Sequence, residues 1–325
     1  MPEATTDQTT QAQTSLPPAA IGTAGSQITA LHCHGSLRLT KSYALADGQV
    51  LEEGYCRAKM FEYTVHPVND LEDLCELLKK YEQSQRTCLI RGVPVNDLPA
   101  EAQRNGTNFP MQDGGARWVC LDIDGIALPD CVDPYGPGGI EYAVNQLPRE
   151  FHTASYIAQF SASAGILNAD GTAYKPGLRA HIFFWLDRRT TNEELKGWLF
   201  DYPVDKAVFT AVQPHYICNP VLGEEVDCAV TSRLYLSRKS KDAVPVPDLS
   251  SHCRTSRAKG PIDTEWTDPR CGLPTLDDLL TCEFIDWYIS NPHPDGERYE
   301  QTRAFAHNLR RVDTDDWETL LEQLI

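Results

Sequence analysis

The sequence contains no apolar stretch of the roughly 18 to 20 residues that a membrane-spanning helix needs. Its first residues lack the basic and then apolar order of a secretory signal peptide. Positive charge is scarce, because 29 Lys and Arg face 46 Asp and Glu, which gives a net charge of −17. We therefore expect a cytoplasmic protein without a membrane partner, and any contact with nucleic acid requires a local basic patch.

Two kinds of site are also missing from the sequence. No Gly-x-x-x-x-Gly-Lys-Ser/Thr loop occurs, which excludes a motor of the P-loop type. The 11 cysteines lack the spacing of a small disulfide framework, which fits free thiols in a reducing compartment. Four zinc ligands could come from His252, Cys253, Cys271 and Cys282, but they include no Cys-x-x-Cys pair, so zinc is not the cofactor that we expect.

Composition divides the chain into four parts. Residues 1–28 consist largely of Thr, Gln, Ala, Ser and Pro, which predicts a disordered tail. We expect a folded core over 29–245, a linker or surface loop over 246–270 and a small helical accessory region over 271–325. The chain could also be a piece of a longer protein, since its last helix runs directly to the final residue.

The core alternates between strand-like and helix-like patterns. Strands are expected near residues 87–92, 118–126, 155–163 and 179–186, and helices after a cap at Asn69 or Asp70 and near 140–147 and 191–200. Because the two kinds of element are mixed along the chain, the pattern predicts a layered fold of the α/β or α+β class.

The first candidate for chemistry is the strand-like segment Trp118–Ile126. Alternation places Asp122 and Asp124 on one face, about 7 Å apart at Cα, and apolar side chains on the other. Two carboxylates on an apolar strand repel each other unless a positive group lies between them, and a divalent cation would meet that need. The alternative is a strand end that turns at Gly125, with both acids in water.

The second candidate is the segment from Leu178 to Asp187. Read as a strand, it places Arg179 and His181 on one face, where a guanidinium and an imidazole suit a triphosphate. The preceding stretch contains Ser161 and Ser163 among small residues that would allow a ligand to approach closely. Taken alone, a histidine such as His181 is more often a core residue with satisfied hydrogen bonds than a ligand-binding residue.

A third segment contributes a further acid. Asp205 lies between apolar residues and could complete a cluster of three carboxylates, or it could cap a turn. Asp201 and Asp227 are its rivals for that position. His215 follows closely in Gln-Pro-His-Tyr.

The segments Leu121–Gly125, Arg179–His181 and Val204–Lys206 occur in the order of three motifs of the archaeo-eukaryotic primase (AEP) superfamily. Over roughly residues 85–245 the chain resembles the primase-polymerases of phages, plasmids and integrated elements. The resemblance implies an α+β fold with an AEP-type catalytic core, made of an α/β module and an RRM-like sheet, and a C-terminal helical region. It departs from the family at Arg179, where members often have Ser.

The resemblance also implies a function. A DNA primase or polymerase of a mobile element, phage or plasmid would transfer nucleotides from (d)NTPs by a two-metal mechanism, with Mg²⁺ or Mn²⁺ held by Asp122, Asp124 and Asp205. The incoming nucleotide would be bound by His181, Arg179, Ser163, Ser161 and His215. A single-stranded DNA template is the expected partner, together with a replicative helicase on another chain or domain, and the enzyme would be associated with the nucleoid.

A local basic stretch could bind the template. Residues 231–260 hold seven basic side chains and two acidic ones, a net charge of +5. From this stretch we expect template contacts from Arg233, Arg238, Lys239 and Lys241. An ordinary solvated loop would have the same composition.

Three other functions remain open at this stage. His32 and His34 resemble the two-histidine motif of rolling-circle replication nucleases, which would need a tyrosine nucleophile such as Tyr55 or Tyr81. A non-catalytic module that binds single-stranded DNA would keep the fold without the reaction. A glycosyltransferase with an Asp-x-Asp motif would bind a nucleotide diphosphate through a metal but would not explain Arg179 and His181.

Overall fold

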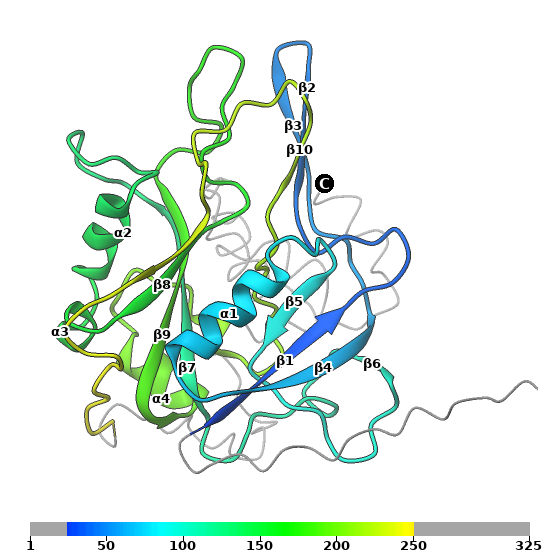
Figure 1. Cartoon of the computed structure of the whole chain (residues 1–325), viewed down its shortest axis with the longest axis vertical. Coiled ribbons are helices and arrows are strands. Elements are labelled where there is room, and N and C mark those ends of the chain that lie inside the picture. The colour runs from blue at the N-terminus through cyan, green and yellow to red at the C-terminus, as the bar shows by residue number, and fades with distance from the viewer. Residues whose placement is uncertain (1–24, 250–325) are drawn as a thin grey trace, which may run out of the picture. The chain divides into compact units, whose positions relative to one another are not determined.

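The computed structural model describes residues 25–249, and Figure 1 shows the arrangement of its elements. Its first sheet, the N-terminal sheet, has the strand order β5-β1-β4-β6. These antiparallel strands are β1 (Ser26–His32), β4 (Met60–Val68), β5 (Thr87–Ile90) and β6 (Glu101–Gln103). Helix α1 (Leu71–Tyr81) follows β4. It begins after Asp70 because the Asp70 carboxylate accepts a hydrogen bond from the Asp73 N–H at 2.8 Å and so caps the helix.

A small hairpin sheet has the order β10-β2-β3. It consists of β2 (Ser42–Ala46), β3 (Gln49–Glu53) and the short β10 (Val221–Leu222), which pairs with β2 in parallel. The turn between β2 and β3 is formed by Asp47 and Gly48, both with positive φ, as a two-residue hairpin of this twist requires.

The third sheet, the C-terminal sheet, has the order β11-β8-β9-β7 and is antiparallel throughout. Its strands are β7 (Ala116–Ile126), β8 (Tyr156–Phe160), β9 (Leu178–Thr190) and β11 (Leu234–Ser237). The long pairing of β7 with β9 forms its centre. Both strands alternate between two sets of side chains, so each contributes to two different layers.

Helices cover one face of the C-terminal sheet. They are α2 (Pro137–Val144), α3 (Arg149–His152) and α4 (Asn192–Trp198), and Figure 1 shows α2 and α3 on the opposite side of this sheet from α1. Their apolar side chains pack with Val119, Leu121 and Ile123 of β7. Thr191 and Glu194 form a reciprocal capping box at the start of α4, which fixes where that helix begins.

The other face of the C-terminal sheet packs against the N-terminal sheet and α1. Trp118, Phe183 and Trp185 share one apolar cluster with Ile28 of β1 and Leu74 of α1. The two large sheets therefore share a core.

The predicted mixture of helices and strands is confirmed, since the described chain has an α+β fold. The boundary of the expected tail is wrong at its end, because β1 begins at Ser26. The rest of that tail, most of the expected linker, the four candidate zinc ligands and the helical region over 271–325 lie outside the described residues. Among residues 25–249, no helix has both the length and the apolar character needed to cross a membrane.

Candidate active site

The pairing of β7 with β9 sets two acids opposite two basic side chains. In this register Asp122 lies opposite His181, and Asp124 lies opposite Arg179. Opposite residues of adjacent strands point to the same face, with Cβ atoms about 5 Å apart. All four side chains consequently occupy the face that is turned toward the N-terminal sheet, beyond the apolar cluster of Trp118 and Phe183.

Each acid contacts the basic side chain opposite to it. The guanidinium of Arg179 forms an ion pair with the Asp124 carboxylate. His181 Nε2 lies 3.5 Å from Asp122 Oδ1. The side chain of Asp122 is 28% exposed and that of Asp124 is 70% exposed, so Asp122 is the inner acid of the two.

Asp205 joins these residues from the short 3-10 helix η1 (Lys206–Phe209). Its backbone N–H donates to the Asp122 carbonyl at 3.2 Å, which holds η1 against β7. Its carboxylate accepts the Ala207 N–H at 2.8 Å and so also caps η1. Asp205 can therefore cap η1 and still be a metal ligand, because a carboxylate has room for further contacts beyond its one hydrogen bond from the Ala207 N–H.

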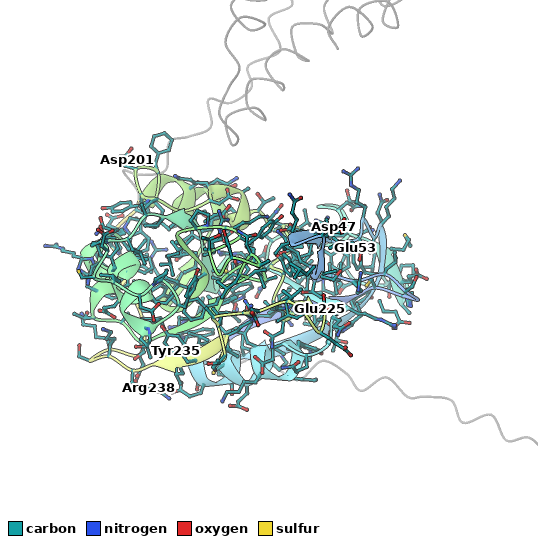
Figure 2. The ribbon with its side chains drawn as sticks, turned by 90° about the horizontal axis from the view of Figure 1, so that it is seen from above. Asp47, Glu53, Asp201, Glu225, Tyr235 and Arg238 are labelled. Atoms are coloured by element: carbon teal, nitrogen blue, oxygen red, sulfur yellow. The ribbon has the colours of Figure 1, made fainter. Side chains whose placement is uncertain are left out.

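The rival acids lie elsewhere. Asp201 is exposed after the end of α4, and Figure 2 shows it at an outer edge of the molecule. Asp227 is also exposed, and its backbone carbonyl accepts the Leu167 N–H at 3.0 Å. Of the three acids proposed for the third carboxylate, Asp205 is the one with a backbone hydrogen bond to the Asp-x-Asp strand.

The electrostatics of Asp122 favour a nearby cation. Burial raises the pKa of Asp122, and the negative charges of Asp124 and Asp205 raise it further, while His181 and Arg179 act in the opposite direction. The ionised carboxylate is therefore costly in this position. A divalent cation would relieve both the burial and the repulsion.

The chemistry of the donor set fits Mg²⁺ or Mn²⁺, since both prefer carboxylate oxygens. Within residues 25–249, no three His, Cys, Asp or Glu side chains are already arranged as a metal-binding group. Arg179 supplies positive charge next to the acids, and His181 lies beside Asp122. Asp122, Asp124 and Asp205 are the residues that would hold the ions.

A bulge at the end of β7 sets the position of Asp124. The register between β7 and β9 shifts between Asp124 and Ile126, and Gly125 within the shift has φ +78°. On the facing turn, Gly177 has φ +80°, and a Cβ there would lie 2.9 Å from the Gly125 carbonyl carbon. Only glycine allows this close approach with positive φ, so the turn before β9 is built around the bulge that presents Asp124.

The two predicted serines lie beside Arg179. The Ser161 N–H donates to the Arg179 carbonyl at 3.0 Å, and the hydroxyls of Ser161 and Ser163 are 3.3 Å apart. Arg233 holds this loop from behind, because its guanidinium donates to the carbonyls of Ser161 and Ala164. Its side chain is buried and bonded to these carbonyls, so its position favours support of the serine loop over the predicted contact with a template.

His215 is likewise buried and does not reach a position where it could bind a phosphate in solution. Its backbone pairs with Leu89 of β5, and its ring packs on Trp118 with 5.3 Å between centroids. Burial lowers the pKa of His215 to about 3, with His181 and Arg91 contributing in the same direction, so the ring is neutral. The expected nucleotide contact of His215 does not fit this position.

Two of the other three predicted template contacts pair with acids. Arg238 forms an ion pair with Glu72, and Figure 2 shows it at the surface. Lys239 Nζ lies 2.7 Å from Glu141. The backbone of Lys241 bonds to that of Thr153 and Ser155. The net positive charge of this stretch in the sequence is therefore partly cancelled in the fold by acids from other elements.

His32 and His34, the two histidines of the nuclease alternative, contact different groups. His32 Nδ1 is 3.0 Å from the Thr87 hydroxyl and Nε2 is 3.3 Å from that of Thr64, so both ring nitrogens have partners. His34 lies beyond the end of β1, 3.7 Å from Glu101 and 3.9 Å from Glu62. In this arrangement the two imidazoles do not share a metal position.

Both candidate tyrosines have structural partners. The Tyr81 hydroxyl lies 2.9 Å from His66 Nε2. Tyr55 stacks on Tyr216 with 3.7 Å between ring centroids. Burial, Tyr216 and the charges of Asp122 and Asp124 all raise the pKa of Tyr55, which opposes its activation as a nucleophile and also indicates that its ring lies near the acids.

One polar residue of this face was not singled out from the sequence. Gln159 of β8 lies opposite His181 and is 3% exposed. The signal for it was present, because Gln159 is the single polar side chain in the otherwise apolar strand Tyr156–Phe160, on the same face as Ile157. Comparisons of the chain with protein-family models, curated proteins and solved structures found no match. Function is therefore inferred from the geometry of these residues.

Proposed function

We propose that this chain is a metal-dependent nucleotidyltransferase, a primase or DNA polymerase that copies a single-stranded DNA template from (d)NTPs. The observation that carries the proposal is the arrangement on one sheet face of Asp122 and Asp124 opposite His181 and Arg179, with Asp205 bonded to the same strand. The proposal includes an AEP-type core, in which the C-terminal sheet is the RRM-like sheet that presents the acids.

In the proposed reaction the 3′-hydroxyl oxygen forms a bond to the α-phosphorus of a nucleoside triphosphate. The bond from that phosphorus to the bridging oxygen breaks, pyrophosphate leaves, and the hydroxyl proton passes to solvent. Mg²⁺ or Mn²⁺ would supply the Lewis acidity that activates the hydroxyl and stabilises the leaving group. No covalent intermediate with the protein is required.

The protein residues bind and orient the reactants. Asp122, Asp124 and Asp205 would hold the ions. Arg179 and His181 would donate to phosphate oxygens, for which a guanidinium fork and an imidazole N–H are both suited. Ser161 and Ser163 could donate hydroxyl hydrogen bonds beside Arg179. Binding of a triphosphate would then compete with Asp124 for Arg179, so nucleotide binding would free a carboxylate for the metal.

The test is incorporation of labelled nucleotides on a single-stranded DNA template, with and without a primer, in Mg²⁺ or Mn²⁺. Wild type is compared with the double variant Asp122→Asn, Asp124→Asn. The matched control is Asp47→Asn, an exposed acid in the β2–β3 turn, where Asn also tolerates the positive φ of 52°. Figure 2 shows Asp47 on the hairpin.

Metal-dependent product from wild type and from Asp47→Asn, and its loss in the double variant, would support the proposal. Product without a primer would make the enzyme a primase, and product only with one would make it a polymerase. Template binding without incorporation, in a folded protein with either metal, would contradict the proposal and favour the non-catalytic binding module. A covalent product between the protein and cleaved template would favour the nuclease.

A further inference from the structure

The three central strands of the C-terminal sheet place a row of three polar side chains side by side. Gln159 of β8 lies opposite His181 of β9, which lies opposite Asp122 of β7. The three side chains point to the same face, and adjacent members have Cβ atoms about 5 Å apart. On one side of the row the face is apolar, because Ile157 and Phe183 belong to the buried cluster, and on the other side lie Asp124 and Arg179.

Gln159 is anchored at one end of its amide. Its Nε2 donates to the Ile217 carbonyl at 2.6 Å, from the segment that follows His215. Because a carbonyl can accept but not donate, this bond identifies which end of the amide is nitrogen. The remaining atom, Oε1, is therefore an acceptor with a fixed position next to His181.

Two buried polar atoms in this row lack a partner among the described residues. They are Oε1 of Gln159, an acceptor, and Nδ1 of His181, which is a donor in one tautomer of the neutral ring and in the charged ring. A buried polar atom without a hydrogen bond is unfavourable, because it has lost its bonds to water without replacing them. Pairing these two atoms satisfies both, and they belong to residues that are direct neighbours across β8 and β9.

We infer that Gln159 is a positioning residue for His181: in the doubly protonated ring, Nδ1–H donates to Gln159 Oε1, so that Nε2–H is directed at Asp122 and at the phosphates of the nucleotide. This rests on the proposed function for the identity of the ligand, but not for the hydrogen bond itself. A histidine that binds through one ring nitrogen is commonly oriented by a hydrogen bond at the other. Gln159 supplies that bond here, and the segment containing Ile217 fixes Gln159 in turn.

The ring of His215 is an alternative partner for His181 Nδ1. His215 has an unpaired Nε2 among the described residues, and the charge of His181 contributes to the lowered pKa of His215, so the two rings are near each other. His215 reaches the face from a separate segment, however, whereas the position of Gln159 opposite His181 is set by the strand register itself. If Gln159 is the partner, substitution of Gln159 removes the hydrogen bond of His181 Nδ1–H; if His215 is the partner, that hydrogen bond remains.

The experiment uses two variants of the full chain that share one defect. Gln159→Met and Gln159→Glu both remove the amide that donates to Ile217, but only Glu keeps an oxygen that can accept from His181. The first readout is the side-chain nitrogen NMR spectrum of ligand-free protein, with the signals of His181 assigned by their absence in His181→Gln. Thermal unfolding of each variant establishes that it is folded before it is compared.

The expected NMR result is a hydrogen-bonded Nδ1–H of His181 in wild type and in Gln159→Glu, and its loss in Gln159→Met. A His181 protonated only at Nε2 in wild type would overturn the inference, as would an unchanged Nδ1–H in folded Gln159→Met. The same spectrum in both variants, altered from wild type alike, would assign the effect to the lost contact with Ile217 and would also overturn it.

Kinetics of incorporation give the second readout. Gln159→Met should raise the KM for the nucleotide about 10-fold and change kcat by less than about 3-fold, because one hydrogen bond to the phosphates is misdirected. Gln159→Glu should restore KM toward wild type. An unchanged KM in Gln159→Met would count against the inference. A wild type without any incorporation, but with the expected NMR result, would contradict the proposed function and leave the positioning role of Gln159 intact.

Discussion

At the scale of single residues, Asp122 is a proposed metal ligand whose carboxylate is costly to ionise in its buried position. It is the inner acid of the pair, its pKa is raised mainly by burial, and His181 only partly compensates its charge. Residues that are retained in such positions often reduce stability in exchange for activity. His215 and Arg91 are two further buried titratable groups on the same side of the sheet, and burial lowers the pKa of both.

We predict that Asp122→Asn increases stability while it abolishes incorporation. The amide keeps the shape but removes a charge that burial, Asp124 and Asp205 all disfavour, so the melting temperature in EDTA should rise by a few degrees, or about 1 kcal/mol. Differential scanning fluorimetry of wild type, Asp122→Asn and the exposed control Asp47→Asn measures this. A lower melting temperature for Asp122→Asn would show that the ion pair with His181 outweighs the cost of burial.

A second prediction concerns acid. The pKa of His215 is about 3 in the folded chain and 6.5 ordinarily, so between these values the unfolded chain binds a proton that the folded chain does not. Stability is therefore lost as the pH falls from about 6.5 toward 3, by on the order of 2 kcal/mol between pH 6.5 and pH 5. His32 and His66, whose pKa values are lowered mainly by burial, act with the same sign.

The measurement is urea unfolding of wild type and His215→Phe at pH 7 and at pH 5. The variant should lose less stability between the two pH values than wild type, whatever its stability at pH 7, because one titrating group has been removed. Some loss should remain from His32 and His66. Equal losses in both proteins would contradict the assignment of this acid sensitivity to His215.

At the scale of elements, alternation along a strand predicted correctly which residues of β7 and β9 share a face. That inference needs only the two-residue period of a strand. Nothing in the sequence states that Asp122 pairs with His181, because the register depends on the packing of both sheet faces and on the bulge at Gly125. Which of the three candidate acids lies beside β7 is also a tertiary property, because it depends on the hydrogen bond from the Asp205 N–H to the Asp122 carbonyl.

Two of the predicted site residues, Arg233 and His215, are buried, which the sequence does not indicate. Both residue types are more often exposed at least in part than fully buried. In the fold, Arg233 is buried against backbone carbonyls and His215 is buried against the ring of Trp118. Local pairing patterns do not reveal which polar residue of a loop will turn inward. Helix boundaries were closer, since the helix expected near 140–147 is observed at Pro137–Val144, with proline in its first turn.

The turn before β9 gives a third prediction. Gly177→Ala should destabilise the protein by about 2 kcal/mol or more, because positive φ is strained for alanine and its Cβ would lie 2.9 Å from the backbone of Gly125. Gly171→Ala is the matched control, with φ +82° and nothing within 4 Å of the added Cβ, and should lose about 1 kcal/mol. Urea unfolding compares them, and equal losses would mean that the contact with the bulge is unimportant.

At the scale of the whole molecule, the site lies where the two large sheets share a core. The N-terminal sheet and α1 pack on the face of β7 and β9 that carries Asp122, Asp124, Arg179 and His181, so substitutions of those residues should affect the stability of both sheets. The chain as a whole carries a net charge of −17, and three acids at one site add local repulsion. Cation binding at the site should thus stabilise the entire fold.

This gives a fourth prediction. A divalent cation at about 100 times its Kd stabilises a folded protein by about 2.7 kcal/mol if it binds the folded state only. Mn²⁺ should therefore raise the melting temperature of wild type by several degrees. The double variant Asp122→Asn, Asp124→Asn should show no such rise at the same ionic strength. A rise of the same size in the double variant would place the cation elsewhere.

The most direct test of the central claim compares five single Asp→Asn variants in the incorporation assay with Mn²⁺. The account predicts that substitution of Asp122, Asp124 or Asp205 lowers the rate by at least about 100-fold. Substitution of Asp201 or Asp227 should leave it within about 3-fold of wild type. If a folded Asp122→Asn or Asp205→Asn variant retained the wild-type rate, or if Asp201→Asn or Asp227→Asn lost it, the site proposed on β7 and η1 would be wrong.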